Sequence, residues 1–226
     1  MSRQKGAALV CEGQTDVPIL TEVLSELWPD IDVRVLQPEL DETDRVARGG
    51  RAGWSEVKSW CEQNREDLDD VLDPLVGDPI DLLLLAVDMD IALEAKIADP
   101  PQKVGAYESP RLRATVESWL MAQKSKVPAQ IMVSTPVLAI EAWVVAALFP
   151  RERSPERVPD PARFLVKKRK LRESPKDGSP WKELHRYRDF AAQIARRLDR
   201  VRKTCPEADR TCDEIEVRRD RPGAHS

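Results

Sequence analysis

The chain has 226 residues, enough for one ordinary α/β domain with an appendage but too few for two full-sized domains. Apolar residues make up 41% of it and charged residues 34%, so a buried core is possible while the surface must be highly charged. No C-x-x-C pair occurs among the four cysteines, and only two histidines accompany them, which disfavours a zinc site or a disulfide framework. No signal peptide or membrane-spanning apolar run is visible, so we expect a cytoplasmic protein without a membrane segment.

The net charge of −4 conceals two regions of opposite sign. Residues 1–150 carry 14 basic and 26 acidic side chains, whereas residues 151–226 carry 22 basic and 14 acidic ones. This division is typical of a protein that holds a metal ion in one part and a polyanion with the other. A solvated basic helical surface would give the same counts, and charge alone does not decide between the two.

The first part of the chain predicts alternating strands and helices. Residues 6–11 are apolar, typical of a buried strand, and residues 31–36 alternate apolar and polar side chains, typical of a half-covered strand. Residues 17–28 and 54–68 repeat apolar side chains at helical spacing. Each strand is therefore expected to lead into a helix.

The strongest strand signal lies over residues 80–90, which are apolar almost without a break and end in carboxylates. A strand buried on both faces belongs to a parallel sheet covered by helices. A helix over residues 110–124, a strand over residues 129–133 and a very apolar helix over residues 136–149 continue the alternation. This order predicts an α/β fold, an open and mostly parallel sheet with helices on both faces.

The chain changes character after the last apolar helix. A proline-rich stretch leads to two basic segments with helical patterns, over residues 162–173 and 181–203, and residues 218–226 are expected to fray. We therefore predict a metal-binding domain over residues 1–150 and a basic helical extension over residues 151–226.

Acidic residues follow two of the predicted strands. Glu12 ends the first strand, and Asp88 and Asp90 end the strand over residues 80–90. Residues two apart in a strand point to the same side, so Asp88 and Asp90 can reach one cation beyond the sheet edge. Neighbouring carboxylates repel one another unless a cation lies between them, and their oxygens are the ligands that Mg²⁺ and Mn²⁺ prefer. If the first and third strands are neighbours, Glu12 faces Asp88 at the edge where open sheets bind ligands.

Two further acids are candidates for the same site. Asp16 lies four residues after Glu12, where it could bind metal or, like Thr15, cap the helix that follows. Glu141 stands alone among apolar residues, and it must reach a metal ion, a basic side chain or the helix margin, because an unpartnered buried carboxylate is costly. Ser134 could support a ligand carboxylate through a hydrogen bond.

The segments CEGQTD at residues 11–16 and VDMD at residues 87–90 resemble the Glu-Gly and Asp-x-Asp motifs of the TOPRIM superfamily. Topoisomerases, bacterial primases and the overcoming-lysogenization-defect (OLD) nucleases share this domain. The acid four positions after the glutamate, here Asp16, resembles the OLD branch, as does a serine before a glutamate-bearing helix, here Ser134 and Glu141. The chain looks most like small stand-alone TOPRIM-like proteins.

The resemblance covers residues 6–150 and implies a metal-dependent nuclease that cleaves DNA or RNA in bacterial phage or plasmid defence. The implied catalytic residues are Glu12, Asp88, Asp90 and Glu141, and the implied ligands of Mg²⁺ or Mn²⁺ are Glu12, Asp16, Asp88, Asp90 and Glu141. A downstream lysine is also implied, for which Lys167, Lys168 or Lys170 qualifies. OLD nucleases carry an ATPase domain on the same chain, but the motif Gly-x-x-x-x-Gly-Lys is absent here, so any ATPase would be a separate partner.

The predicted nucleic-acid-binding run consists of Lys167, Lys168, Arg169 and Lys170. It would bind backbone phosphates without reading bases, although it could equally be a solvated stretch of helix. The competing hypothesis is a catalytically silent TOPRIM-like subunit of an ATPase-containing defence or repair complex, and the retained set of like charges argues against it. Nucleotidyl transfer would need a nucleotide pocket that the sequence does not show. Topoisomerase chemistry would need a catalytic tyrosine, and neither Tyr107 nor Tyr187 lies in a suggestive context.

Overall fold

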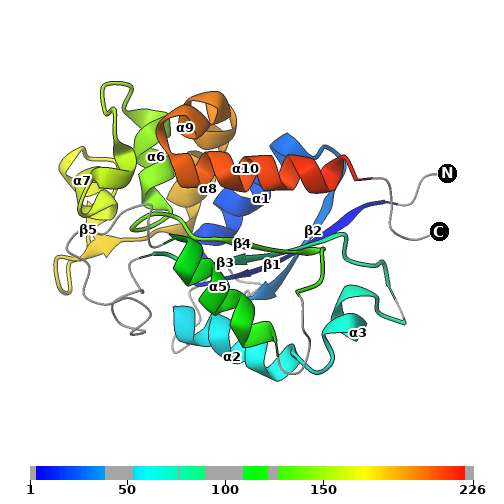
Figure 1. Ribbon diagram of the computed structural model, residues 1–226. Coiled ribbons are helices and arrows are strands. Elements are labelled where there is room, and N and C mark those ends of the chain that lie inside the picture. Colours follow the sequence, from blue (N-terminus) through cyan, green and yellow to red (C-terminus); the bar gives the residue numbers. More distant parts are fainter. Residues whose placement is uncertain (1–3, 39–52, 76, 90–108, 122–126, 222–226) are drawn as a thin grey trace.

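The computed structural model describes residues 4–38, 53–75, 77–89, 109–121 and 127–221, and these form an α/β fold around a parallel sheet (Figure 1). The strands of this sheet are β1 (Gly6–Cys11), β2 (Asp32–Gln37), β3 (Leu82–Ala86) and β4 (Ile131–Ser134). Their order is β2-β1-β3-β4, and every neighbouring pair is parallel. The fold class expected from the alternating pattern is confirmed.

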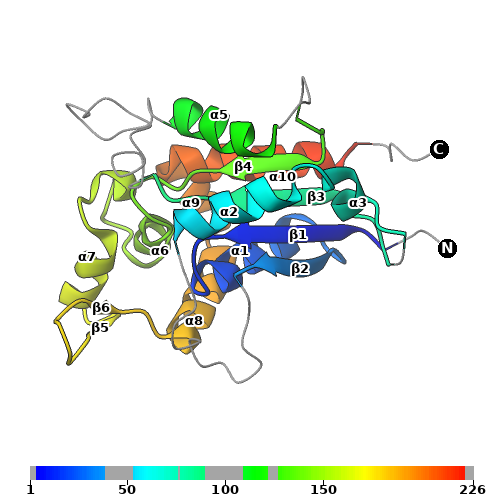
Figure 2. The same ribbon diagram turned by 90° about the horizontal axis from the view of Figure 1, so that it is seen from below.

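Helices cover both faces of the sheet (Figure 2). One face carries α2 (Trp54–Asn64), α3 (Leu68–Leu72) and α5 (Ser109–Leu120), and the other carries α1 (Asp16–Leu27), α6 (Glu141–Leu148), α8 (Leu184–Ala195) and α10 (Pro206–Arg219). Successive side chains of β1 alternate between the two cores, with Leu9 in one and Val10 in the other. Burial on both faces is the reason that β1 and β3 read as unbroken apolar runs.

The edge strand β2 shows the half-burial that its alternating sequence predicts. It pairs only with β1 among the described strands, and most of its side chains are of intermediate exposure. No helix in the described part of the chain is long and apolar enough to cross a membrane.

The C-terminal region contains α7 (Pro161–Lys167), a short hairpin of β5 (Arg172–Glu173) and β6 (Pro180–Trp181), then α8, α9 (Leu198–Thr204) and α10. The predicted helix over residues 162–173 is therefore too long, because its end is strand β5. The predicted helix over residues 181–203 is also wrong in part. Strand β6 precedes α8, and the helix is interrupted between α8 and α9. No proline or glycine lies at this interruption. The interruption allows α9 to pack against α6 as a separate helix.

Helix α10 covers the outer edge of the sheet. Arg210 donates a hydrogen bond to the carbonyl oxygen of Val133 at 2.8 Å, and Arg218 donates one to that of Ile131 at 2.9 Å. Both acceptors belong to the edge strand β4, whose outer backbone groups would otherwise lack partners. Part of the basic charge of residues 151–226 therefore stabilises the fold.

Glu207, at the start of α10, is the acidic counterpart of these arginines. Its side chain is 6% exposed and pairs with Arg113 at 3.1 Å and with Arg210. It also accepts hydrogen bonds from the backbone amide and hydroxyl of Thr135. These contacts join α5, α10 and the end of β4.

Replacing Arg210 tests this connection. We expect Arg210→Ala to lower the free energy of unfolding by ~2 kcal/mol, because it leaves the buried Glu207 carboxylate with less compensation and the Val133 carbonyl without a donor. Urea unfolding followed by circular dichroism measures the change. The control is Arg169→Ala, which removes an exposed arginine and should change stability by less than ~0.5 kcal/mol. Equal effects of the two substitutions would contradict the structural role of Arg210.

Candidate acidic site at the sheet edge

The candidate site lies where the path of the chain along the sheet reverses direction. From β1 the chain continues through α1 to β2 at one edge, whereas β3 precedes α5 and then β4 at the other edge. The helices α1 and α5 lie on opposite faces. In open α/β sheets, the carboxyl ends of two such central strands are where ligands bind.

Glu12 and Asp88 meet at these carboxyl ends. Glu12 directly follows β1, and its Oε1 accepts a hydrogen bond from the backbone amide of Asp88 at 2.7 Å. Both residues are partly exposed. The first and third strands are therefore neighbours, as expected, and their pairing brings Glu12 to the end of β3.

The strand that leads to Asp88 is shorter than predicted. The expected range was residues 80–90, but β3 ends at Ala86, where its pairing with both neighbouring strands also ends. Asp88 therefore lies in the segment after the strand, and Asp90 lies outside the described residues. The alternation of side chains along a strand therefore ends at Ala86.

Asp16 is 7% exposed, at the first residue of α1. Its Oδ2 accepts a hydrogen bond from the amide of Gly13 at 3.0 Å, and its own amide donates to the Gly13 carbonyl at 3.1 Å. This reciprocal pair links the start of α1 to the turn after β1. The alternative cap, Thr15, makes no side-chain capping bond. Burial, and then the charge of Glu141, raise the pKa of Asp16 to about 7 despite an opposing contribution from Lys182.

Glu141 is fully buried as the first residue of α6, so this helix starts five residues later than the predicted range of 136–149. Its Oε1 accepts a hydrogen bond from the Tyr187 hydroxyl at 2.5 Å and lies 2.8 Å from Nζ of Lys182. Its Oε2 has no hydrogen-bond partner among the described residues. The sequence left open whether Glu141 reaches a metal ion, a basic side chain or the helix margin. The structure shows a basic side chain, Lys182.

Lys182 and Tyr187 are the members of the site that the sequence did not reveal. Desolvation alone would lower the pKa of Lys182, but the charge and hydrogen bond of Glu141 outweigh it and raise that pKa, helped by Asp88 and Asp16. Burial, and then the charge of Glu141, raise the pKa of Tyr187, which is fully buried. Tyr187 therefore acts as a hydroxyl donor and is poorly suited to be a nucleophile. In the sequence it reads as an apolar-face residue of a helix, and Lys182 resembles many other lysines.

The expected basic run is exposed to solvent. All four of its residues, Lys167, Lys168, Arg169 and Lys170, are exposed at the end of α7 and in the turn after it. Within the described residues none pairs with a carboxylate, and the ammonium of Lys168 lies 5.4 Å from the ring centroid of Phe164. The lysine that pairs with Glu141 is Lys182, which is not part of this run.

Ser134 contacts α10. Its hydroxyl is buried and shares a hydrogen bond of 2.9 Å with the hydroxyl of Thr211 in α10. Thr211 of α10 is the partner that the structure shows for this hydroxyl, and support of a ligand carboxylate by Ser134 stays a prediction.

The acids fall into two pairs. Glu12 is linked to the backbone of Asp88 by a hydrogen bond, and the charge of Glu141 acts on Asp16. Among the residues that the structure describes, no three Asp, Glu, His or Cys side chains are close enough together to hold a metal ion, and Asp90 is not one of these residues. The donor chemistry nevertheless suits Mg²⁺ or Mn²⁺, since it consists of carboxylate oxygens, one of them buried without a hydrogen-bond partner in the described part of the chain. Lys182 supplies the compensating positive charge in this arrangement.

A pocket of about 310 Å³ lies between α1 and α8. Gln14, Val17 and Pro18 line one wall, and Leu184 and Arg188 line the other. Both walls belong to the segments that carry Asp16 and Tyr187.

Comparisons of the chain with protein-family models, with curated proteins and with solved structures found no match.

A double-mutant cycle tests the pairing of Glu141 with Lys182. We expect Lys182→Met to lower the free energy of unfolding by ~1 kcal/mol, a modest value because the lysine side chain is 45% exposed. Glu141→Gln should lower the free energy of unfolding by less in the Lys182→Met background than in the wild type. In that background the ion pair is already absent, so the substitution no longer breaks it. Urea unfolding of the four proteins gives the coupling energy, with Lys170→Met as the matched control. Strictly additive effects would contradict the pairing.

Proposed function

We propose that this protein is a Mg²⁺- or Mn²⁺-dependent nuclease that hydrolyses phosphodiester bonds in DNA or RNA. The observation that carries the proposal is the meeting of Glu12 and Asp88 at the carboxyl ends of adjacent parallel strands, joined by a hydrogen bond of 2.7 Å. The charges of Asp16, Asp88 and Glu141 all raise the pKa of Lys182 and that of Tyr187, so these acids lie in one electrostatic neighbourhood. The TOPRIM-like motifs at residues 11–16 and 87–90 support the same chemistry.

Each acid has a role in this proposal. Asp88, together with Asp90, would hold one metal ion, and Glu12, with Asp16 and Glu141, would hold a second ion or position water. A bound ion would neutralise phosphate charge and lower the pKa of a bound water. Glu12 is partly exposed and is the best candidate for general base or acid.

Lys182 contributes a fixed cation. Its side chain runs from solvent to the buried Glu141 carboxylate, since it is 45% exposed while Glu141 is fully buried. A cation in this position offsets the repulsion between a phosphodiester and the surrounding carboxylates. It would also stabilise the additional negative charge that develops on the phosphate in the transition state.

The basic run at the end of α7 would hold the nucleic acid backbone. Its side chains are exposed, and α7 lies with the β5–β6 hairpin beyond the carboxyl ends of the central strands (Figures 1 and 2). Binding through phosphates is largely independent of sequence and weakens with salt. An ATPase, if one takes part, would be a separate chain.

Metal addition tests the site without requiring activity. Millimolar Mn²⁺ should raise the melting temperature by several degrees, because an ion that binds only the folded state stabilises it, and each kcal/mol corresponds to ~2–4 °C for a chain of this size. Differential scanning fluorimetry with and without EDTA measures the shift. Glu12→Gln and Asp88→Asn should reduce it, whereas Asp70→Asn, an exposed acid on α3, should not. The same shift in all four proteins would count against the site.

Cleavage is tested with supercoiled plasmid and with labelled RNA in the presence of Mn²⁺. The wild type should nick or degrade one of these substrates, and Asp88→Ala should reduce the rate at least ~100-fold because an ion ligand is lost. Asp70→Ala should retain activity. If the wild type and Asp88→Ala behave identically, both alone and with a candidate ATPase partner, the silent-subunit hypothesis replaces the nuclease proposal.

A further inference from the structure

Trp181 is an aromatic side chain that the core does not use. It is 45% exposed at the end of β6, and among the described residues the other large exposed apolar side chains are Leu75 and Val217. It lies opposite Arg172 of β5 in the antiparallel hairpin. Tryptophan is enriched at binding interfaces, because its ring is apolar and its N–H group is polar.

The stretch of chain that contains Trp181 is strongly basic. Residues 161–182 carry eight basic and two acidic side chains. The exposed basic residues of this stretch are Lys167, Lys168, Arg169, Lys170, Arg172, Lys176 and Lys182, and within the described part of the chain only Lys182 among these seven pairs with a carboxylate. The arginines of α10, by contrast, are committed to carbonyls and acids of the fold. The charge around Trp181 is thus available for a polyanion.

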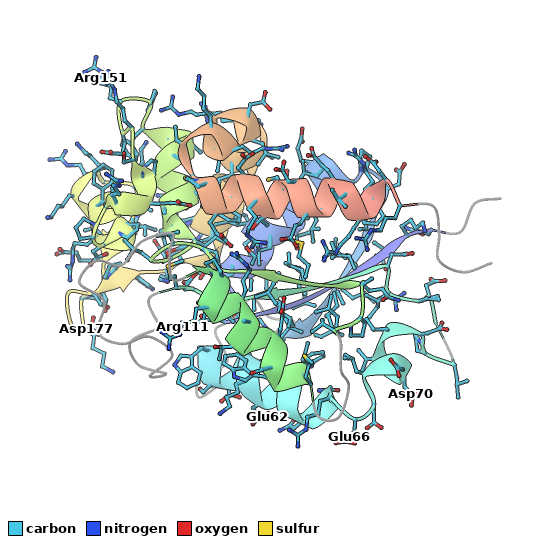
Figure 3. All side chains as sticks on the ribbon, in the orientation of Figure 1. Glu62, Glu66, Asp70, Arg111, Arg151 and Asp177 are labelled. Carbon is cyan, nitrogen blue, oxygen red and sulfur yellow. The ribbon has the colours of Figure 1, made fainter. Side chains whose placement is uncertain are left out.

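The hairpin segment itself carries two acidic residues, Glu173 and Asp177, and other acids gather elsewhere. Figure 3 shows Asp177 at the turn of the hairpin, whereas Glu62, Glu66 and Asp70 lie along the side formed by α2 and α3. The basic surface that contains Trp181 is therefore separate from this acidic side.

Trp181 directly precedes a residue of the acidic site in the sequence. The following residue, Lys182, reaches Glu141 at 2.8 Å, and consecutive Cα atoms are only ~3.8 Å apart. In both ribbon views the hairpin lies beyond the carboxyl ends of the central strands (Figures 1 and 2). A ligand that covers Trp181 would therefore lie close to the acids.

We propose that Trp181 is a stacking platform for an unpaired nucleobase, and that the basic residues of α7 and β5 bind the flanking phosphates. The inference rests on the proposed function and names its substrate class, single-stranded nucleic acid. An aromatic ring stacks on the face of any base, but in a duplex those faces are already stacked. Unpaired cations around the ring favour this ligand over a protein partner, which would need acidic and apolar groups combined.

Binding assays in EDTA test the inference independently of cleavage. The probes are fluorescein-labelled oligo(dT), oligo(U) and a DNA duplex of equal length, followed by fluorescence anisotropy at low salt. Trp181→Ala should weaken binding to at least one single strand ~10-fold, because stacking contributes ~1–3 kcal/mol per base. Trp181→Phe should restore most of the affinity. Duplex binding should change less than ~2-fold, since it depends on phosphate contacts.

The controls separate stacking from other effects. Leu75→Ala removes another exposed apolar side chain and should leave all affinities unchanged. Equal single-strand affinity of the wild type and Trp181→Ala would overturn the inference and favour a protein partner for this surface. An equal loss for single strands and duplex would overturn it as well, because the ring would then not be selecting unpaired bases. Neither result would bear on the Asp88→Ala cleavage test, so failure of the platform and failure of the nuclease proposal remain distinguishable.

Discussion

The parallel pairing of β1 with β3 is the constraint on which the rest of this structure depends. Both strands are apolar and buried on both faces, so helices must cover the sheet from two sides. The helices that come after these strands lie on opposite faces, and the two carboxyl ends remain side by side. Glu12 can therefore reach the backbone amide of Asp88, although 76 positions separate them in the chain.

The second constraint is the cost of placing like charges together in partly buried surroundings. Burial and the charge of Glu141 raise the pKa of Asp16 to about 7, while Lys182 and the Tyr187 hydroxyl compensate Glu141 itself. The acids come from the first part of the chain and their compensation from the C-terminal part. The C-terminal region consequently belongs to the site as well as to the core.

The basic charge of the C-terminal region has two physical uses. Arginines of α10 bind carbonyls of the edge strand and pair with Glu207, which stabilises the fold. The lysines at the end of α7 and residues of the hairpin have exposed charges near an exposed tryptophan. A count of charges could not separate these uses, because an arginine that closes a sheet edge and one that binds phosphate contribute equally to it.

The sequence by itself determined the alternation of strands and helices, the parallel sheet and the placement of Glu12 and Asp88 after strands, because apolar periodicity and strand ends are local properties. It overestimated the strand before Asp88, and it could not show that Lys182 and Tyr187 reach Glu141. The Tyr187 hydrogen bond joins residues 46 positions apart, and only the packing of α8 against α6 creates it. Tertiary structure decided which lysine compensates the acids, since a buried carboxylate is stabilised by the cation that packing brings within reach, whatever its place in the chain.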